Sequence, residues 1–175
     1  HFNVLGIECF LPFDYAGHKF VGFIDRLDSF SDGEIRIVDY KTGKVSDKEM
    51  MVMGESGVDE VYAKSVFDSI FDPDAKDNPK IALQFFIYNL MLCNSEKGKA
   101  MAEGKKILNS VYSLSHLYDD AAREYCLTKE VFDYAGDKVR ATLDEIFDLQ
   151  GHPEFKRTEN TATCAYCDFR MICGR

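Results

Sequence analysis

Alternating apolar and polar positions predict three strands in the first forty residues. The alternation runs loosely over 3–14, returns over 19–30, and ends with a third run at Lys41. Short turns around Gly17 and Gly33 separate these runs, and both glycines provide the permissive backbone that tight turns need. Strands joined by turns this short form an antiparallel meander.

The rest of the chain predicts helices and two further strands. Apolar residues at helical spacing predict helices over 58–71, 80–93 and 129–149, the last with Thr128 as its N-cap candidate. The remaining segments are predicted as a Met-rich mobile loop with one helical turn (44–57), a polar connection (97–106), and strands over 107–114 and 124–127.

Composition suits one globular domain over residues 1–175, of which 46% are hydrophobic. No stretch predicts a membrane span or a signal peptide, so the expected location is cytoplasmic and no membrane partner is expected. The formal net charge of -9 argues against a broad phosphate-binding face. Because the first residue is His1 rather than Met, we expect a fragment of a longer protein.

The third predicted strand ends in polar groups that suit a small site. Ile35 and Ile37 alternate with Arg36 before the pattern changes at Asp39-Tyr40-Lys41. Residues two apart on a strand share a face, so Asp39 and Lys41 project together, with Cα atoms roughly 6.5 Å apart. Asp25 lies about as far before the connecting turn as Asp39 lies after it, so the hairpin brings these two carboxylates together.

Oxygen donors of this kind indicate a divalent metal site. The carboxylates of Asp25 and Asp39 and the carbonyl of Tyr40 are hard ligands that Mg²⁺ or Mn²⁺ prefers. Lys41 supplies a positive charge that can orient a nucleophile or stabilise a phosphate. A plainer interpretation stays open, in which Asp25, Arg26 and Asp28 are surface strand residues in ion pairs.

The helix predicted over 80–93 is apolar on most sides, apart from Gln84 and Tyr88. These two residues are four apart and therefore share one helix face. A buried amide and phenol need hydrogen-bond partners. A neighbouring active site would provide them, and so would backbone groups at the edge of a core.

Three cysteines near the end of the chain, Cys164, Cys167 and Cys173, have the spacing C-x2-C-x5-C. In a chain without secretion signals, thiols this dense read as metal ligands. Three ligands fall short of the four that a [4Fe-4S] cluster or structural zinc takes, so another is needed, or the thiols are free. The candidates for a fourth ligand are Cys9, Cys93, Cys126, His152 and a residue upstream of His1.

Together these motifs resemble the RecB-like branch of the PD-(D/E)XK nuclease superfamily. The segments that carry the resemblance are 22–28 (GFIDRLD), 37–43 (IVDYKTG), Gln84 with Tyr88, and Cys164, Cys167 and Cys173. They occur in the same order and span 8–175, and the most similar proteins are the C-terminal nuclease domains of AddB-type helicase-nuclease subunits.

The resemblance implies an α/β fold with a restriction-endonuclease-like core, in which a central mixed sheet begins with the antiparallel three-strand meander and is flanked by helices. It implies that Asp25 and Asp39 bind the metal, that Lys41 is catalytic, and that Gln84 and Tyr88 line the site.

The resemblance also implies that Cys164, Cys167 and Cys173 bind a [4Fe-4S] cluster and make residues 151–175 a C-terminal clasp. The fourth cluster cysteine of the family normally lies well upstream and has no counterpart here. Glu8 resembles an acidic residue that often precedes the first core strand, with no assigned role.

The function expected from this resemblance is metal-dependent hydrolysis of DNA, as an exonuclease domain acting in recombination or repair with a helicase. A basic DNA channel would then be built by other parts of a larger protein. The alternative is a non-catalytic nuclease-like scaffold that binds DNA ends or docks a helicase partner. A zinc-binding regulatory tail is a lesser alternative.

Overall fold

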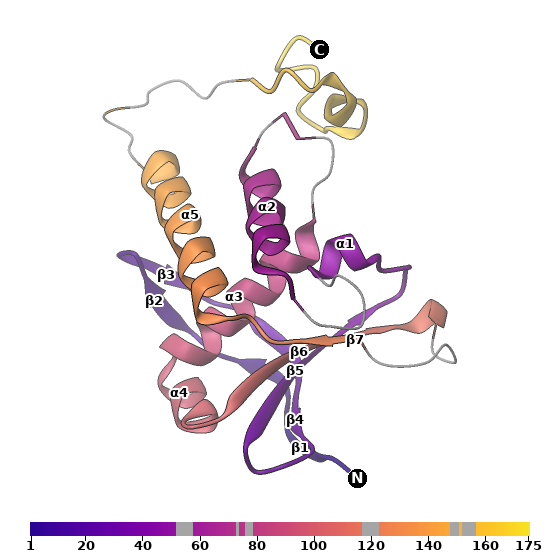
Figure 1. The fold of residues 1–175 in the computed structure, drawn as a ribbon. Coiled ribbons are helices and arrows are strands. Elements are labelled where there is room, and N and C mark those ends of the chain that lie inside the picture. The colour runs from indigo at the N-terminus through magenta and orange to yellow at the C-terminus, as the bar shows by residue number, and fades with distance from the viewer. Residues whose placement is uncertain (52–57, 73, 76–78, 117–122, 148–150, 152–156) are drawn as a thin grey trace.

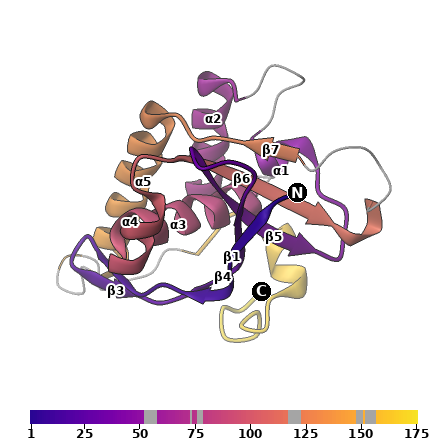
Figure 2. The same cartoon turned by 90° about the horizontal axis from the view of Figure 1, so that it is seen from below.

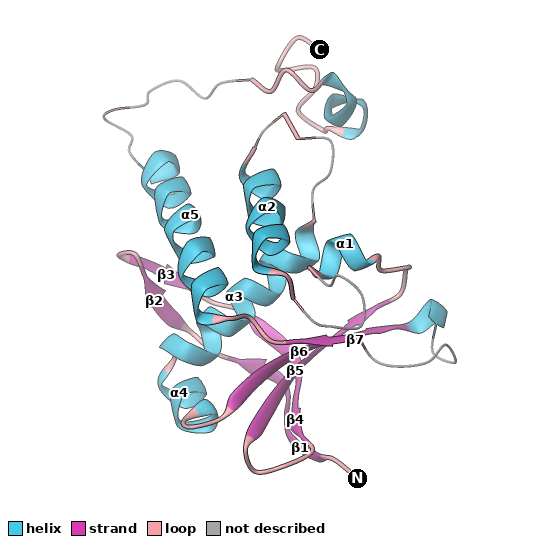
Figure 3. Ribbon diagram, viewed as in Figure 1, coloured by secondary structure: helices cyan, strands magenta, loops and turns pink. Residues whose placement is uncertain are grey.

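A mixed five-stranded sheet in the order β1-β4-β5-β6-β7 forms the centre of the computed structural model (Figure 1). The structure describes residues 1–51, 58–72, 74–75, 79–116, 123–147, 151 and 157–175. The strands of the sheet are β1 (Asn3–Phe10), β4 (Phe23–Ser29), β5 (Glu34–Lys41), β6 (Lys106–Ser113) and β7 (Arg123–Tyr125). Helices flank this sheet (Figure 3), so the predicted α/β class is confirmed.

Strand directions match the predicted meander. β1 pairs antiparallel with β4, and β4 pairs antiparallel with β5. β6 then lies parallel to β5, while β7 returns antiparallel to β6. A parallel pair needs a long crossover, and here the helical segments between β5 and β6 provide it.

The two predicted strands over 3–14 and 19–30 are each broken, which the sequence pattern did not reveal. Their ends separate into β2 (Phe13–Tyr15) and β3 (His18–Phe20), which form a two-stranded sheet of their own. The break in the first follows from Pro12, which has no backbone N–H to donate to a ladder. The break in the second falls at Gly22, whose missing side chain leaves room for Met91, with the Met91 Cε 3.2 Å from an ideal Cβ position.

Three predicted helices are confirmed as α2 (Glu60–Phe71), α3 (Lys80–Asn94) and α5 (Lys129–Phe147). Asp59 caps α2 by accepting from the Tyr62 backbone N–H at 2.8 Å. Thr128 caps α5 as expected, because its Oγ1 accepts from the Val131 N–H at 3.3 Å.

Two segments predicted as irregular contain helices. Residues 97–106 were predicted as a polar connection, but α4 (Glu96–Ala102) occupies most of this segment. Ser95 caps α4, and the buried Gly98 allows the helix to lie closely against the end of α3. In the Met-rich segment, α1 (Asp47–Met50) is the expected helical turn, and Met50 and Met51 are fully buried in the core. Residues 52–57 of the predicted loop lie outside the described residues.

The core lies between the sheet and the helices. α3 has buried residues on most sides, among them Phe85, Phe86 and Leu92. α2 and α5 pack against each other, and Figure 2, seen from below, shows α3, α4 and α5 to one side of strands β4, β5 and β6. Within the described residues, no helix is long and apolar enough to cross a membrane.

Candidate active site

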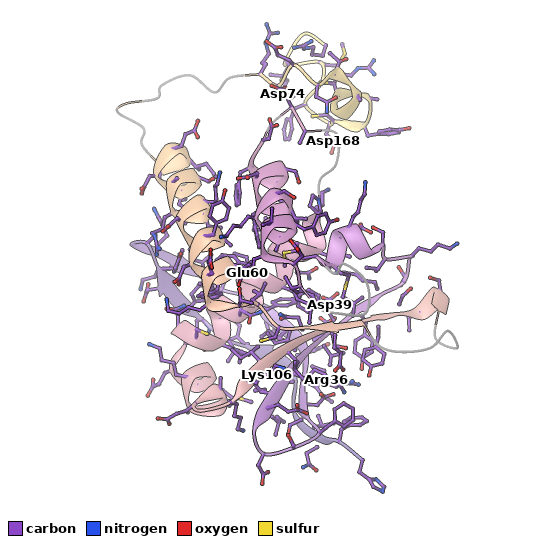
Figure 4. All side chains as sticks on the ribbon, in the orientation of Figure 1. Arg36, Asp39, Glu60, Asp74, Lys106 and Asp168 are labelled. Carbon is purple, nitrogen blue, oxygen red and sulfur yellow. The ribbon has the colours of Figure 1, made fainter. Side chains whose placement is uncertain are left out.

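The alternation of β5 directs Asp39 and Lys41 toward α3. Ile35 and Ile37 precede them on the same face and are fully buried in the core. Asp39 continues this face and is only 2% exposed, whereas Lys41 lies at the end of the strand and its side chain is 28% exposed. A carboxylate therefore lies at the boundary between the core and solvent, which Figure 4 shows on the helical side of the sheet.

Gln84 and Tyr88 of α3 meet these two β5 residues in one hydrogen-bond network. The Gln84 Nε2 donates to Asp39 Oδ1 at 3.0 Å and to the Tyr88 hydroxyl at 2.6 Å. The Tyr88 hydroxyl donates to Asp39 Oδ1 at 3.2 Å. The Lys41 Nζ donates to Gln84 Oε1 at 2.7 Å and lies 2.8 Å from Asp39 Oδ2. The amide and the phenol thus bind the side chains of the site rather than backbone groups.

Asp25 joins the site from β4. The antiparallel register pairs Arg26 with Val38, so the next position places Asp25 beside Asp39. Its carboxylate is held by the peptide that follows Asp39, because the Tyr40 N–H donates to Asp25 Oδ2 at 3.0 Å. The predicted proximity of the two carboxylates is therefore confirmed.

Burial disfavours the charged form of Asp39. Desolvation raises the pKa of Asp39, hydrogen bonding and charge attraction from Lys41 oppose this, and the nearby charge of Asp25 raises the pKa further. Burial and the charge of Asp39 also raise the pKa of Tyr88, so its hydroxyl stays protonated and able to donate. Lys41 alone does not fully compensate the buried carboxylate.

This donor set fits a hard divalent cation. Asp25, Asp39 and the Tyr40 carbonyl are all oxygen donors, and a cation between the carboxylates would relieve both the desolvation and their repulsion. Within the described residues, no group of three or more His, Cys, Asp or Glu side chains is placed to hold a metal. Mg²⁺ is typically bound by only one or two protein carboxylates, because it keeps several waters and takes further oxygens from a substrate phosphate.

The cysteines present a different outcome. Cys164, Cys167 and Cys173 lie in the C-terminal segment 157–175, which contains η3 (Thr161–Tyr166), and all are free thiols. In the part of the chain that the structure describes, these thiols do not form a metal-holding group. Binding of a [4Fe-4S] cluster or a zinc ion by these cysteines stays a prediction.

The proposed fourth ligands stay predictions. Desolvation raises the pKa of the thiols of Cys9, Cys93 and Cys126. His152 lies outside the described residues. A ligand upstream of His1 stays a prediction.

The C-terminal segment is held at the connection between α2 and α3. The Thr158 hydroxyl and the Glu159 N–H donate to Asp74 Oδ1 at 3.3 Å and 3.0 Å, and Asn160 donates to the Ala75 carbonyl at 3.3 Å. Figure 4 labels Asp74 beside this segment, far from Asp39. The two candidate metal centres are thus separate in space.

Glu8 lies on β1, the strand that pairs with β4. The register pairs Ile7 with Arg26 and Cys9 with Ile24, which leaves Glu8 across from Asp25. Glu8 has a positive φ of 46°, which is uncommon for a residue other than glycine. Its side chain is exposed, and its role stays open.

The family model of the PD-(D/E)XK nuclease superfamily matches residues 1–174. The chain belongs to the PD-(D/E)XK nuclease superfamily. A comparison with curated proteins finds no match, so the similarity to AddB-type nuclease domains within this superfamily stays a prediction.

Sequence reasoning missed charged residues on the other face of β4 and β5. Arg26 does pair with Asp28 at 2.8 Å, as the plainer interpretation suggested, but Asp28 is fully buried instead of lying on the surface. Arg36 is also buried and binds the same carboxylate through its Nε at 2.7 Å. The signal for this pairing was present in the register, because the hairpin places Asp28 directly across from Arg36.

Proposed function

We propose that this PD-(D/E)XK chain is a divalent-metal-dependent deoxyribonuclease with Asp25, Asp39 and Lys41 at its centre. The network of Asp39 with Lys41, Gln84 and Tyr88 is the observation that carries the proposal. It supports catalysis because a buried carboxylate, an ammonium and two fixed donors are held within hydrogen-bond distance of one another at an exposed strand end.

The residues divide the chemistry between them. Asp25, Asp39 and the Tyr40 carbonyl would hold Mg²⁺ or Mn²⁺, and when bound such an ion lowers the pKa of water and neutralises charge on a phosphate. Lys41 presents its ammonium group to the attacking water and to the developing negative charge on the phosphate. Gln84 fixes the direction of Lys41 by accepting its hydrogen bond and fixes Asp39 by donating to it.

The reaction is a direct displacement at phosphorus. Water adds to the phosphodiester, the bond to one ester oxygen breaks, and the products are a phosphate monoester and a free hydroxyl group. No side chain of this network becomes covalently attached to the phosphate.

The finer assignment is to an exonuclease that works with a helicase in DNA recombination or repair. It rests on the resemblance in residues 22–28 and 37–43. The net charge of -9 supports a division of labour, since a chain this acidic needs a partner surface to attract DNA. A cytoplasmic location belongs to the same proposal.

Cleavage of DNA by the full-length protein tests the proposal. Linear duplex and covalently closed circular DNA are incubated with Mg²⁺ or Mn²⁺, and with EDTA, using wild type, Asp39→Ala and Lys41→Ala. We expect metal-dependent degradation of linear DNA, reduced about 10²- to 10⁴-fold in both variants, the range for a group that transfers protons or stabilises charge. The matched controls are Asp137→Ala and Lys129→Ala, which remove exposed charges on α5 and should cleave like wild type.

Wild-type cleavage by both site variants in a clean preparation would contradict the nuclease proposal. Binding of DNA ends without cleavage at any divalent metal would favour the scaffold alternative instead. Cleavage of closed circular DNA as rapidly as linear DNA would retain the nuclease but overturn the exonuclease assignment.

A further inference from the structure

A second polar network lies on the face of β5 opposite Asp39. Its centre is Arg26 of β4, which is largely buried, with 15% of its side chain exposed. The guanidinium donates from Nη1 to the Tyr40 hydroxyl, and its carbon lies 5.4 Å from the centroids of both the Tyr40 and the Tyr112 rings. These two rings face each other across β5 and β6 with centroids 5.9 Å apart.

Arg26 also forms an ion pair with a buried carboxylate. Its Nε lies 2.8 Å from Asp28 Oδ2, and Asp28 is fully buried. Arg36 binds both oxygens of Asp28, at 2.7 Å and 3.0 Å, and reaches Glu124 of β7 at 2.5 Å. This chain of charges spans β4, β5 and β7, and the ion pair with Asp28 holds the Arg26 guanidinium beside Tyr40.

Tyr40 connects this network to the candidate site through its backbone. Its peptide N–H donates to Asp25 Oδ2 at 3.0 Å, and its carbonyl is one of the proposed metal donors. Tyr40 as a whole is 43% exposed, so apolar packing alone does not determine its position. The contact with Arg26 therefore fixes the position of Tyr40, whose backbone N–H binds the Asp25 carboxylate and whose carbonyl is a proposed metal donor.

We propose that Arg26 is a positioning residue that acts through Tyr40 to hold the donors of the metal site in place. The inference rests on the proposed metal-dependent function. Residues that orient metal ligands without binding the metal themselves typically contribute about 10- to 100-fold in metal affinity or activity. The Arg26–Tyr40 contact takes that role from the opposite face of the sheet.

Mn²⁺ affinity tests this role separately from DNA cleavage. Mn²⁺ binding to the full-length protein is measured by electron paramagnetic resonance for wild type, Arg26→Met and Tyr40→Phe. The matched controls are Arg140→Met and Tyr134→Phe. Arg140 also pairs with a carboxylate, Asp137, at 2.9 Å and lies 5.4 Å from the ring centroid of Tyr15. Tyr134, like Tyr40, has its hydroxyl bonded to a charged side chain, and it donates to Asp68 at 2.7 Å.

We expect the dissociation constant for Mn²⁺ to rise about 10-fold in Arg26→Met and a few-fold in Tyr40→Phe, with both controls within about twofold of wild type. Saturating Mn²⁺ should recover part of the cleavage that Arg26→Met loses at limiting Mn²⁺, because Lys41 and Asp39 are untouched. The double variant should bind Mn²⁺ about as weakly as Arg26→Met, since both changes remove the same contact.

Two results would overturn the inference. One is an unchanged Mn²⁺ affinity in both variants while wild type binds the ion and Asp39→Ala does not. The other is additive losses in the double variant, which would mean that Arg26 and Tyr40 act independently. If Arg26→Met does not fold, Tyr40→Phe decides alone, because it keeps the ring. Failure of wild type to bind Mn²⁺ would instead overturn the proposed function, and the positioning role with it.

Discussion

Tyr88 and Tyr125 form a matched pair whose hydroxyl groups should have opposite effects on stability. Both are buried, and both pack edge-on against Phe85, with ring centroids 5.9 Å and 5.8 Å away. The Tyr88 hydroxyl accepts from Gln84 and donates to Asp39, whereas that of Tyr125 has no hydrogen-bond partner among the described residues. Replacing each tyrosine by phenylalanine removes only the oxygen.

Tyr88→Phe should destabilise the protein. A hydrogen bond to a charged group contributes about 1.5–3 kcal/mol, and part of this is offset because the buried hydroxyl no longer has to be desolvated. We expect a loss of about 1–2 kcal/mol in the free energy of unfolding, which for a chain of this size lowers Tm by about 2–8 °C. DNA cleavage should fall as well, because Asp39 loses one of its fixed donors.

Tyr125→Phe should leave stability unchanged or raise it. Burying a hydroxyl without a partner costs about 1–3 kcal/mol in mutational data, and the phenylalanine variant avoids this cost. Burial also raises the pKa of Tyr125, so the group is neutral in both the folded and unfolded protein at ordinary pH. Cleavage should equal that of wild type, because the ring lies outside the candidate site.

Denaturant unfolding of the metal-free protein, with Tm as a second measure, compares the two variants with wild type. An equal loss of stability in both would refute the reasoning. It would mean that the Tyr125 hydroxyl has a partner, and a buried water is the natural choice. Asn109, paired with Tyr125 across β6 and β7, also has a side-chain nitrogen without a partner among the described residues.

Three further predictions concern metal and charge. Mn²⁺ at about 100 times its dissociation constant should stabilise the protein by about 2.7 kcal/mol, an effect that EDTA and Asp39→Ala both remove in thermal unfolding. Lys138 holds the pKa of Asp68 below its usual value, so the ion pair stabilises the folded protein above the unfolded pKa of about 3.9, and this stabilisation is lost as pH falls. Asp68→Asn should therefore lower the free energy of unfolding by less than about 1 kcal/mol at pH 7 and by nothing near pH 2. Denaturant unfolding at both pH values checks this. Arg36→Met should cost about 3–5 kcal/mol, because it removes a partner from the buried Asp28, and an unchanged unfolding midpoint would contradict this.

Local patterns were sufficient to predict most of the candidate site. Period-two alternation placed Asp39 and Lys41 on one face, and helical spacing placed Gln84 and Tyr88 on another. The sequence could not show that these faces meet, because this depends on how α3 crosses the sheet. The resemblance to a nuclease family supplied that link, and the contacts between the four side chains agree with it.

The elements that were missed depend on tertiary context. α4 has the polar composition of a connection, and only the Ser95 cap and the close approach of Gly98 to α3 make it a helix. The burial of Met50 and Met51 depends on α1 lying against α3, which spacing along the chain does not encode. Burial of Arg36 likewise required the strand register, since an arginine in an exposed strand has the same sequence pattern.

The two faces of β5 differ in how well their buried charges are compensated. This difference distinguishes the candidate site from a structural ion pair. Burial alone would lower the pKa of Arg36, but hydrogen bonds to Asp28 and Glu124 raise it, so the charged form is the stable one. The pKa of Asp39 is also raised, which for an acid means that the charged form is disfavoured even with Lys41 beside it. The buried charges on the Arg36 face therefore compensate one another, whereas one more positive charge would stabilise the buried carboxylate on the Asp39 face. The divalent cation of the proposed function would meet that need, and the same argument predicts that no cation binds on the Arg36 side.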